Sequence, residues 1–232
     1  SSTMSDKLKN MTIRAITGTI FVAAVVTCFL RPEAMMFLFA LVTALSVWEF
    51  TGLVNNSGDV RVNRFICTVA GVYLFLAFAG FCSGITPAAV FIPYLLTVVY
   101  LFISELYTKA PNPINNWAYT MLSQMYIALP FSMINVVAFH STGDAHVYDY
   151  LLPLSIFIFL WTNDTGAYIS GSLLGRHKLF PRVSPGKSWE GSIGGGLLVL
   201  AVAALVGYLA NSSEGGHALS IPAWMGLGLV VV

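Results

Sequence analysis

Long apolar runs dominate the pattern along the chain. Seven of them can each cross a hydrocarbon core as a helix, which takes roughly 20 residues. They extend over approximately 15–30, 34–54, 65–82, 85–103, 117–139, 147–175 and 191–210. An eighth run begins at Ile221 and, at about 1.5 Å per residue, is too short to cross before Val232. The pattern predicts an all-α, polytopic transmembrane helix bundle of about seven complete spans and a partial eighth, forming a single integral membrane domain over residues 1–232.

The two ends of the sequence carry separate expectations. Ser1–Thr3 precede Met4 and are expected to be a cloning remnant. The first apolar run lacks a small-x-small cleavage site, which favours an uncleaved span over a signal peptide. The last run either ends a fragment of a longer protein or packs as a half-helix against the bundle, and we favour the fragment.

Charged residues are few and lie mostly on one side of the predicted membrane. They make up 9% of the chain against 57% hydrophobic residues, and the formal charge of +1 excludes a broad nucleic-acid surface. Alternating the spans leaves Arg31 alone on one side. The opposite side holds Lys7, Lys9, Arg14, Arg61, Arg64, Lys109, Arg176, Lys178, Arg182 and Lys187. The positive-inside rule therefore predicts a cytoplasmic amino terminus.

Three groups of reactive side chains are interpreted as structural. Cysteines 28, 67 and 82 lie in apolar runs without ligand spacing, which indicates neither a disulfide framework nor a zinc site. The loose set of His140, Asp144, His146 and Asp149 predicts a solvated loop. Glu49 and Glu105 end two spans on the cytoplasmic side, where solvation by headgroup water is favoured over a place in a cavity.

A polar run interrupts the apolar stretch 147–175. Asn163 and Asp164 lie near its middle, and ionisable groups at membrane depth are costly and tend to be functional. In a helix, Asp164, Tyr168, Gly171 and Gly175 share one face. That face could line a polar cavity. The alternative is a carboxylate that is hydrogen-bonded at a helix break.

The segment from Arg176 to Ser188 is basic and rich in proline. Pro181 and Pro185 prevent a regular helix, which predicts an irregular cytoplasmic loop. A helix that starts near Trp189 would direct the positive end of its dipole at this loop. The side chains suited to phosphate oxygens are Lys178, Arg182, Ser184, Lys187 and Ser188. The alternative is the positive-inside rule acting alone.

Glycines flank this basic segment. Gly186-Lys187-Ser188 fails as a Walker A loop because Pro181 stands where that motif needs a glycine. Close helix packing explains Gly191, Gly194, Gly195 and Gly196 more simply than a dinucleotide turn does.

The runs Asn163–Tyr168 and Gly175–Gly191 resemble the phosphatidate cytidylyltransferase (CDP-diacylglycerol synthase) family. The resemblance implies an enzyme that joins CTP to phosphatidic acid, giving CDP-diacylglycerol and pyrophosphate with Mg²⁺. It implies catalytic roles for Asp164 and Lys187, with Asp164 also holding the metal. The implied substrate-binding residues are Asn163, Tyr168, Lys178, Arg182, Ser184 and Ser188.

The resemblance also sets expectations for partners and location. The expected partners are CTP, phosphatidic acid and bilayer lipid, with a homodimer as a further candidate and no nucleic acid. The expected location is the bacterial inner membrane, with the active side cytoplasmic. The family's second signature, a basic and acidic cluster near its carboxyl end, does not occur in this sequence, so the chain alone is expected to hold half an active site. The rival hypothesis is a transporter or channel whose intramembrane carboxylate binds a cation or proton.

Overall fold

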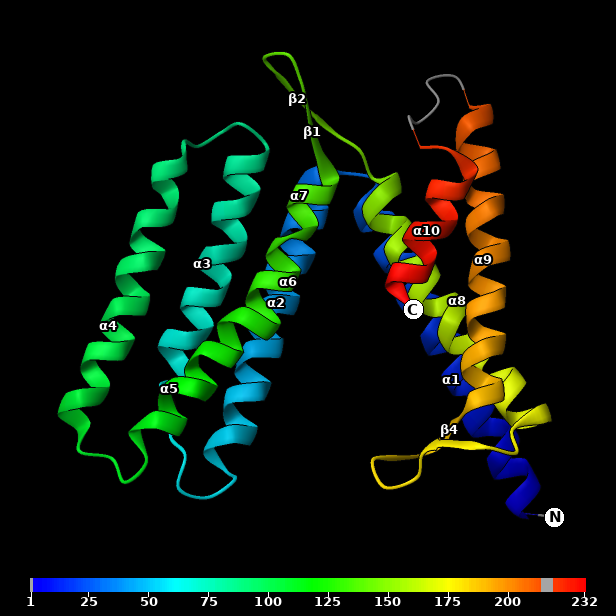
Figure 1. Cartoon of the computed structure of the whole chain (residues 1–232), viewed down its shortest axis with the longest axis horizontal. Helices are drawn as coiled ribbons and strands as arrows, with labels where there is room; N and C mark the ends of the chain where they lie inside the picture. The colour runs from blue at the N-terminus through cyan, green and yellow to red at the C-terminus, as the bar shows by residue number, and fades with distance from the viewer. Residues whose placement is uncertain (1, 214–218) are drawn as a thin grey trace. The chain divides into compact units, whose positions relative to one another are not determined.

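The computed structural model describes residues 2–213 and 219–232 and consists mostly of helices (Figure 1). It divides into two compact units, Ser1–Tyr150 and Leu151–Val232. The first unit contains α1 (Ser2–Phe29), α2 (Pro32–Asn55), α3 (Arg64–Cys82), the 3-10 helix η1 (Ala88–Phe91), α4 (Ile92–Thr108), α5 (Pro113–Leu122), the π-helix η2 (Ser123–Ala128), α6 (Leu129–Ser132), α7 (Ile134–Ala138), β1 (Phe139–Thr142) and β2 (Ala145–Tyr148). The second contains α8 (Leu151–Leu174), β3 (Lys178–Phe180), β4 (Ser184–Ser188), α9 (Trp189–Ser212) and α10 (Ile221–Val231).

The predicted polytopic helical architecture is confirmed. Within the described residues, 6 helical segments are long and apolar enough to cross a membrane: Leu8–Phe29, Pro32–Asn55, Arg64–Cys82, Ala88–Thr108, Pro113–Ala138 and Trp189–Ser212. Helix α8 occupies the predicted span 147–175 but is not among them, because its second half is polar. Its crossing stays a prediction, as does the single domain over 1–232. Helix α10, with 11 residues, is the predicted partial span.

The first unit packs around a small apolar core and contains one interrupted span. Val47, Leu74 and Leu101 belong to this core. The expected helix over 117–139 is broken by the π-helical turn η2, in which the Leu129 amide bonds to the Gln124 carbonyl, just before Pro130. Proline cannot donate an amide hydrogen bond, and π-turns accommodate such breaks. The Gln124 side chain then ties three elements together: its Nε2 donates to the Cys67 carbonyl at 2.9 Å, and Tyr94 donates to its Oε1 at 3.0 Å.

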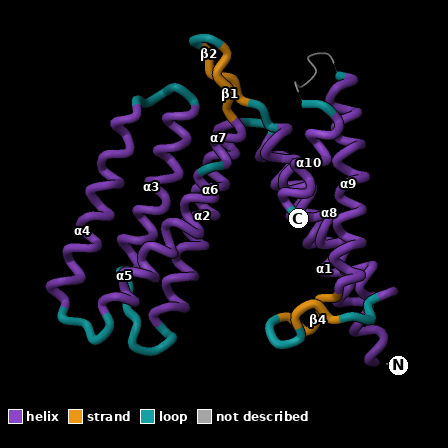
Figure 2. Tube along the Cα trace, viewed as in Figure 1, coloured by secondary structure: helices purple, strands orange, loops and turns teal. Residues whose placement is uncertain are grey.

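The segment predicted to be a solvated loop forms a β-hairpin (Figure 2), so the predicted form was wrong, although residues 140–147 are exposed. His140 and Asp149 approach each other at 3.7 Å, and the described residues contain no group of three or more side chains able to hold a metal. The Tyr148 hydroxyl donates to the Phe29 carbonyl at 2.6 Å, and its burial, with the charges of Asp149 and Glu33, raises the pKa of Tyr148 to about 12. The three cysteines are free; Cys67 is buried, and Cys28 and Cys82 are partly buried.

In the second unit, α8 and α9 approach each other so closely that their backbones are in contact. A Cβ added to Gly166 would lie 3.0 Å from the Gly195 Cα, and one added to Gly191 would lie 2.9 Å from the Ala167 carbonyl. Glycine permits this approach because it has no side chain. The predicted packing role is therefore confirmed for Gly191 and Gly195, and also for Gly194, where an added Cβ would collide with the Ser170 side chain of α8. It was wrong for Gly196, where an added Cβ would meet nothing within 4 Å.

Candidate active site

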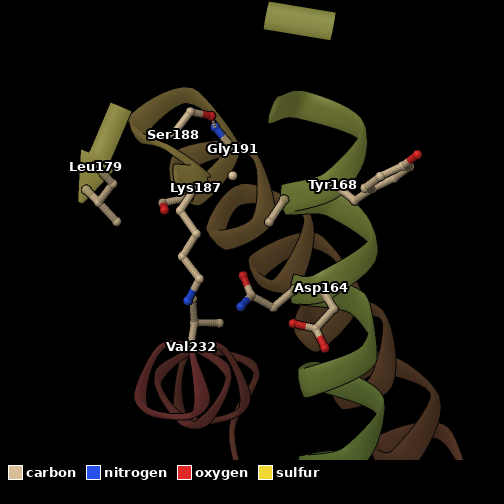
Figure 3. A pocket seen from close by; sticks show the side chains of 11 residues that line it. Asp164, Tyr168, Leu179, Lys187, Ser188, Gly191 and Val232 are labelled. Atoms are coloured by element: carbon tan, nitrogen blue, oxygen red, sulfur yellow. Dashed lines mark hydrogen bonds between the residues drawn. The ribbon is translucent and has the colours of Figure 1, made fainter. Parts of the chain in front are cut away.

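A cavity of about 420 Å³ lies within the second unit, between α8, the β3–β4 hairpin, the start of α9 and the end of α10. It brings together five of the eight residues that the sequence predicted for the site (Figure 3): Asn163, Asp164, Tyr168, Lys187 and Ser188. Lys178, Arg182 and Ser184 do not line it. The cavity therefore unites the polar run with one end of the basic segment.

Helix α8 supplies the acidic wall of the cavity. It runs unbroken from Leu151 to Leu174, so the alternative of a carboxylate at a helix break was wrong. Asp164 is exposed and lines the cavity, and no ion pair joins it to Lys187 in the described chain. Tyr168 lies one turn further along, 76% exposed, and Figure 3 shows its ring pointing away from Lys187. The carboxylate is thus available to a ligand.

Asn163 adds an unsatisfied acceptor beside Asp164. Its Oδ1 is buried without a hydrogen-bond partner, against Gly195, where an added Cβ would lie 2.5 Å from this oxygen. Most buried polar atoms in proteins are paired, so an unpaired one calls for an explanation. A half-turn about the last side-chain torsion exchanges the amide oxygen and nitrogen, so the same side chain can present either a donor or an acceptor to the cavity.

The basic segment forms an antiparallel hairpin, and the prediction of an irregular loop was wrong. Lys178 pairs with Ser188 and Phe180 with Ser184, with a register shift between them. The prolines exclude a helix as expected, but they leave enough backbone donors for a short ladder. The hairpin separates the predicted phosphate-binding side chains, because Lys187 reaches the cavity and Lys178 does not.

Ser188 starts helix α9. Its hydroxyl accepts the Gly191 amide at 3.1 Å, and the residue is 5% exposed. Such a cap satisfies one of the free amides in the first turn. The predicted helix start near Trp189 is confirmed, and the positive end of the α9 dipole faces the cavity edge formed by Gly191.

Replacing Ser188 by alanine is expected to destabilise the protein by about 1 kcal/mol, because the cap bond is lost. The measurement is thermal unfolding in detergent, followed by circular dichroism. Ser192→Ala is the matched control, since Ser192 is exposed in the same helix and caps nothing. Equal midpoints for the two variants would show that the cap is not stabilising.

Sequence reasoning missed the pair that closes the base of the hairpin. His177 Nδ1 lies 2.6 Å from Glu190 Oε1, and the His177 amide donates to the same carboxylate at 3.2 and 3.3 Å. This pair ties the entry to β3 to the first turn of α9. The available signal was an acidic residue in the first turn of a predicted helix, a place where the helix dipole favours negative charge.

The donor set suits a metal ion that arrives with phosphates. Among the described residues, Asp164 supplies the carboxylate side chain that lines the cavity. No group of three metal-binding side chains is present among these residues. Mg²⁺ typically keeps several waters and binds through one or two carboxylates together with substrate phosphates. Asp164 would therefore supply a carboxylate to such an ion, with the other ligands coming from water and phosphate oxygens.

Comparison with known proteins identifies the family. The model of the cytidylyltransferase family matches residues 12–232. A phosphatidate cytidylyltransferase of Haemophilus influenzae is 30% identical over 214 residues, covering 86% of this chain and 74% of that protein. One from Staphylococcus aureus strain COL is 24% identical over 223 residues, covering 96% and 79%. One from Pseudomonas aeruginosa is 54% identical over 44 residues, covering 19% and 16%. Because the family match takes in nearly the whole sequence, this multi-pass membrane protein belongs to the cytidylyltransferase family.

Proposed function

We propose that the protein transfers a cytidylyl group from CTP to phosphatidic acid, giving CDP-diacylglycerol and pyrophosphate. The observation that carries the proposal is the cavity that Asp164 and Lys187 both line. A carboxylate with no ion pair among the described residues and an ammonium group beside a helix amino terminus match the needs of a phosphate-transfer site. The names of the relatives supply the nucleotide and lipid classes.

The reaction depends more on the positioning of the two substrates than on covalent catalysis by a side chain. An oxygen of the lipid phosphate attacks the α-phosphorus of CTP, and the bond from that phosphorus to the pyrophosphate oxygen breaks. Lys187 offsets the negative charge that gathers on the phosphates, in a cavity where charges are only partly screened. Asn163 and Tyr168 supply hydrogen bonds that orient the substrates. When bound through Asp164, Mg²⁺ would neutralise further phosphate charge.

We further propose that this site opens to the cytoplasm of a bacterial inner membrane. The hairpin at its mouth carries Lys178, Arg182 and Lys187, and cations concentrate on the cytoplasmic side of membrane proteins. CTP is made in the cytoplasm, so this orientation gives the nucleotide direct access.

The test is CTP-dependent formation of CDP-diacylglycerol in membranes that contain the protein as its gene encodes it. The rival hypothesis of a transporter or channel predicts solute flux into sealed vesicles without consumption of CTP. The family match favours transfer over transport. Flux in the absence of any nucleotide product would end the proposal.

Lys187→Ala is expected to lower the turnover number by about 10²- to 10³-fold, the usual cost of removing one charge-stabilising group. Lys187→Arg should retain part of the activity because it keeps the charge. Lys9→Ala removes an exposed cation of α1 and should leave turnover unchanged. Wild-type turnover by Lys187→Ala would remove this residue from the mechanism.

A further inference from the structure

The side of the β3–β4 hairpin that does not line the cavity combines exposed apolar and cationic side chains. Phe180 is 59% exposed and Val183 is 84% exposed, and Lys178 and Arg182 are exposed beside them. We call these four residues the hairpin tip; Phe180, Arg182 and Val183 lie at or beside the turn, and Lys178 lies at the other end of β3, opposite Ser188. An aromatic ring and a branched aliphatic chain left in water lose the free energy of burial. The tip is therefore suited to an environment that is both apolar and negatively charged.

The negative charge near the tip is already engaged. Between residues 176 and 190 the acidic residue is Glu190, and its carboxylate is held by the ring and the amide of His177. The cations of the tip have no ion pair among the described residues. Lys178 and Arg182 also do not line the cavity, so a nucleotide bound there would not neutralise them.

The hairpin is joined directly to the start of helix α9, which brings the hairpin to the level of the membrane surface. Helix α9 has 24 residues, about 36 Å of helix against a hydrocarbon core of roughly 30 Å. The hairpin precedes its first residue, Trp189, which is 56% exposed, and tryptophan is enriched at the headgroup level. In Figure 1 the hairpin runs across the end of α9 instead of continuing along its axis.

We propose that the hairpin tip dips into the headgroup layer and binds anionic lipid. Phe180 and Val183 enter the boundary between headgroups and acyl chains, as the apolar faces of interfacial segments do. Lys178 and Arg182 pair with lipid phosphates, and each cation near an anionic surface strengthens the association about fivefold. Phosphatidic acid is itself an anionic lipid, so this contact would gather substrate beside the cavity. That last consequence rests on the proposed function, whereas the surface contact does not.

The depth of the tip can be measured with a nitroxide label at Val183→Cys, in a protein whose native cysteines are replaced by alanine. The protein is reconstituted in vesicles of phosphatidylcholine, with or without phosphatidylglycerol. With the anionic lipid, the label should collide more with lipid-soluble oxygen and less with a water-soluble nickel complex. Thr142→Cys, in the exposed β1–β2 hairpin, is the matched control and should stay accessible to nickel in both vesicles.

A second measurement keeps the native cysteines. Trypsin cleaves after Lys178 and Arg182, and anionic vesicles should slow that cleavage by about fivefold or more relative to phosphatidylcholine. In the labelled protein, Lys178→Gln with Arg182→Gln should remove the dependence on anionic lipid, while Phe180→Ser should reduce immersion in both vesicles. Each of these results would support the proposal.

Equal nickel accessibility at Val183 and Thr142 in both vesicles would overturn the proposal. Immersion that does not respond to lipid charge would also overturn it, because the cations would then have no role. These readouts do not depend on catalysis. A buried tip in a protein that makes no CDP-diacylglycerol would therefore contradict the proposed function and leave the surface contact standing.

Discussion

Asp164→Asn is expected to reduce CTP-dependent CDP-diacylglycerol synthesis by at least about 10²-fold, as the loss of a central electrostatic group usually does. The substitution keeps the size and shape of the side chain and removes its charge. In the described chain Asp164 is the cavity-lining carboxylate side chain, so no neighbouring acidic side chain can replace it. The measurement is the rate of labelled CDP-lipid formation from CTP at saturating Mg²⁺.

The matched control is Asp144→Asn, an exposed acidic residue in the turn of the β1–β2 hairpin. It should retain full activity. A binding measurement is independent of turnover. In the presence of a non-reactive CTP analogue, the wild type should bind Mg²⁺ more tightly than the Asp164→Asn variant does. If Asp164→Asn made CDP-diacylglycerol at the wild-type rate, this carboxylate would have no part in the reaction, whatever the control shows.

Gly195→Ala is expected to destabilise the second unit by about 1–3 kcal/mol, the usual cost of overpacking. The new methyl group would lie 2.9 Å from the Asn163 carbonyl and 2.5 Å from its Oδ1. Backbone atoms cannot move aside as a flexible side chain does, so α8 and α9 must separate. The measurement is the thermal unfolding midpoint in a fixed detergent.

Gly196→Ala is the matched control one residue away. Its methyl group would meet nothing within 4 Å, and alanine is a better helix former than glycine by about 1 kcal/mol. This variant should therefore unfold at the same or a higher temperature. If Gly195→Ala behaved in the same way, main-chain contact would not be what holds the two helices together.

The helical architecture could be predicted from the sequence because crossing a membrane imposes a length and an apolarity that few other structures share. The predicted spans 34–54, 65–82 and 191–210 fall within one or two residues of α2, α3 and α9. The span 117–139 is interrupted in the structure. Its π-turn lies just before Pro130 and is accompanied by hydrogen bonds of Gln124 to α3 and α4, which are tertiary contacts that periodicity along one segment does not contain.

The candidate site was predicted in part. Asp164 and Tyr168 could be assigned to one face because helical spacing is regular, and both line the cavity. The hairpin could not be predicted from its sequence, because its register depends on which strand residues pair and prolines only exclude a helix. As a result Lys187 and Lys178, both of which the sequence placed among the side chains suited to phosphate, lie in different surroundings. The roles of all eight predicted site residues stay predictions.

The main-chain contact between α8 and α9 limits how the cavity can change shape. With no layer of side chains between Gly166 and Gly195, neither helix can slide or roll past its neighbour without a collision of backbone atoms. The two helices must behave as a stiff wall. The His177–Glu190 pair joins the β3–β4 hairpin to the first turn of α9, so the hairpin is anchored to the rigid pair of helices.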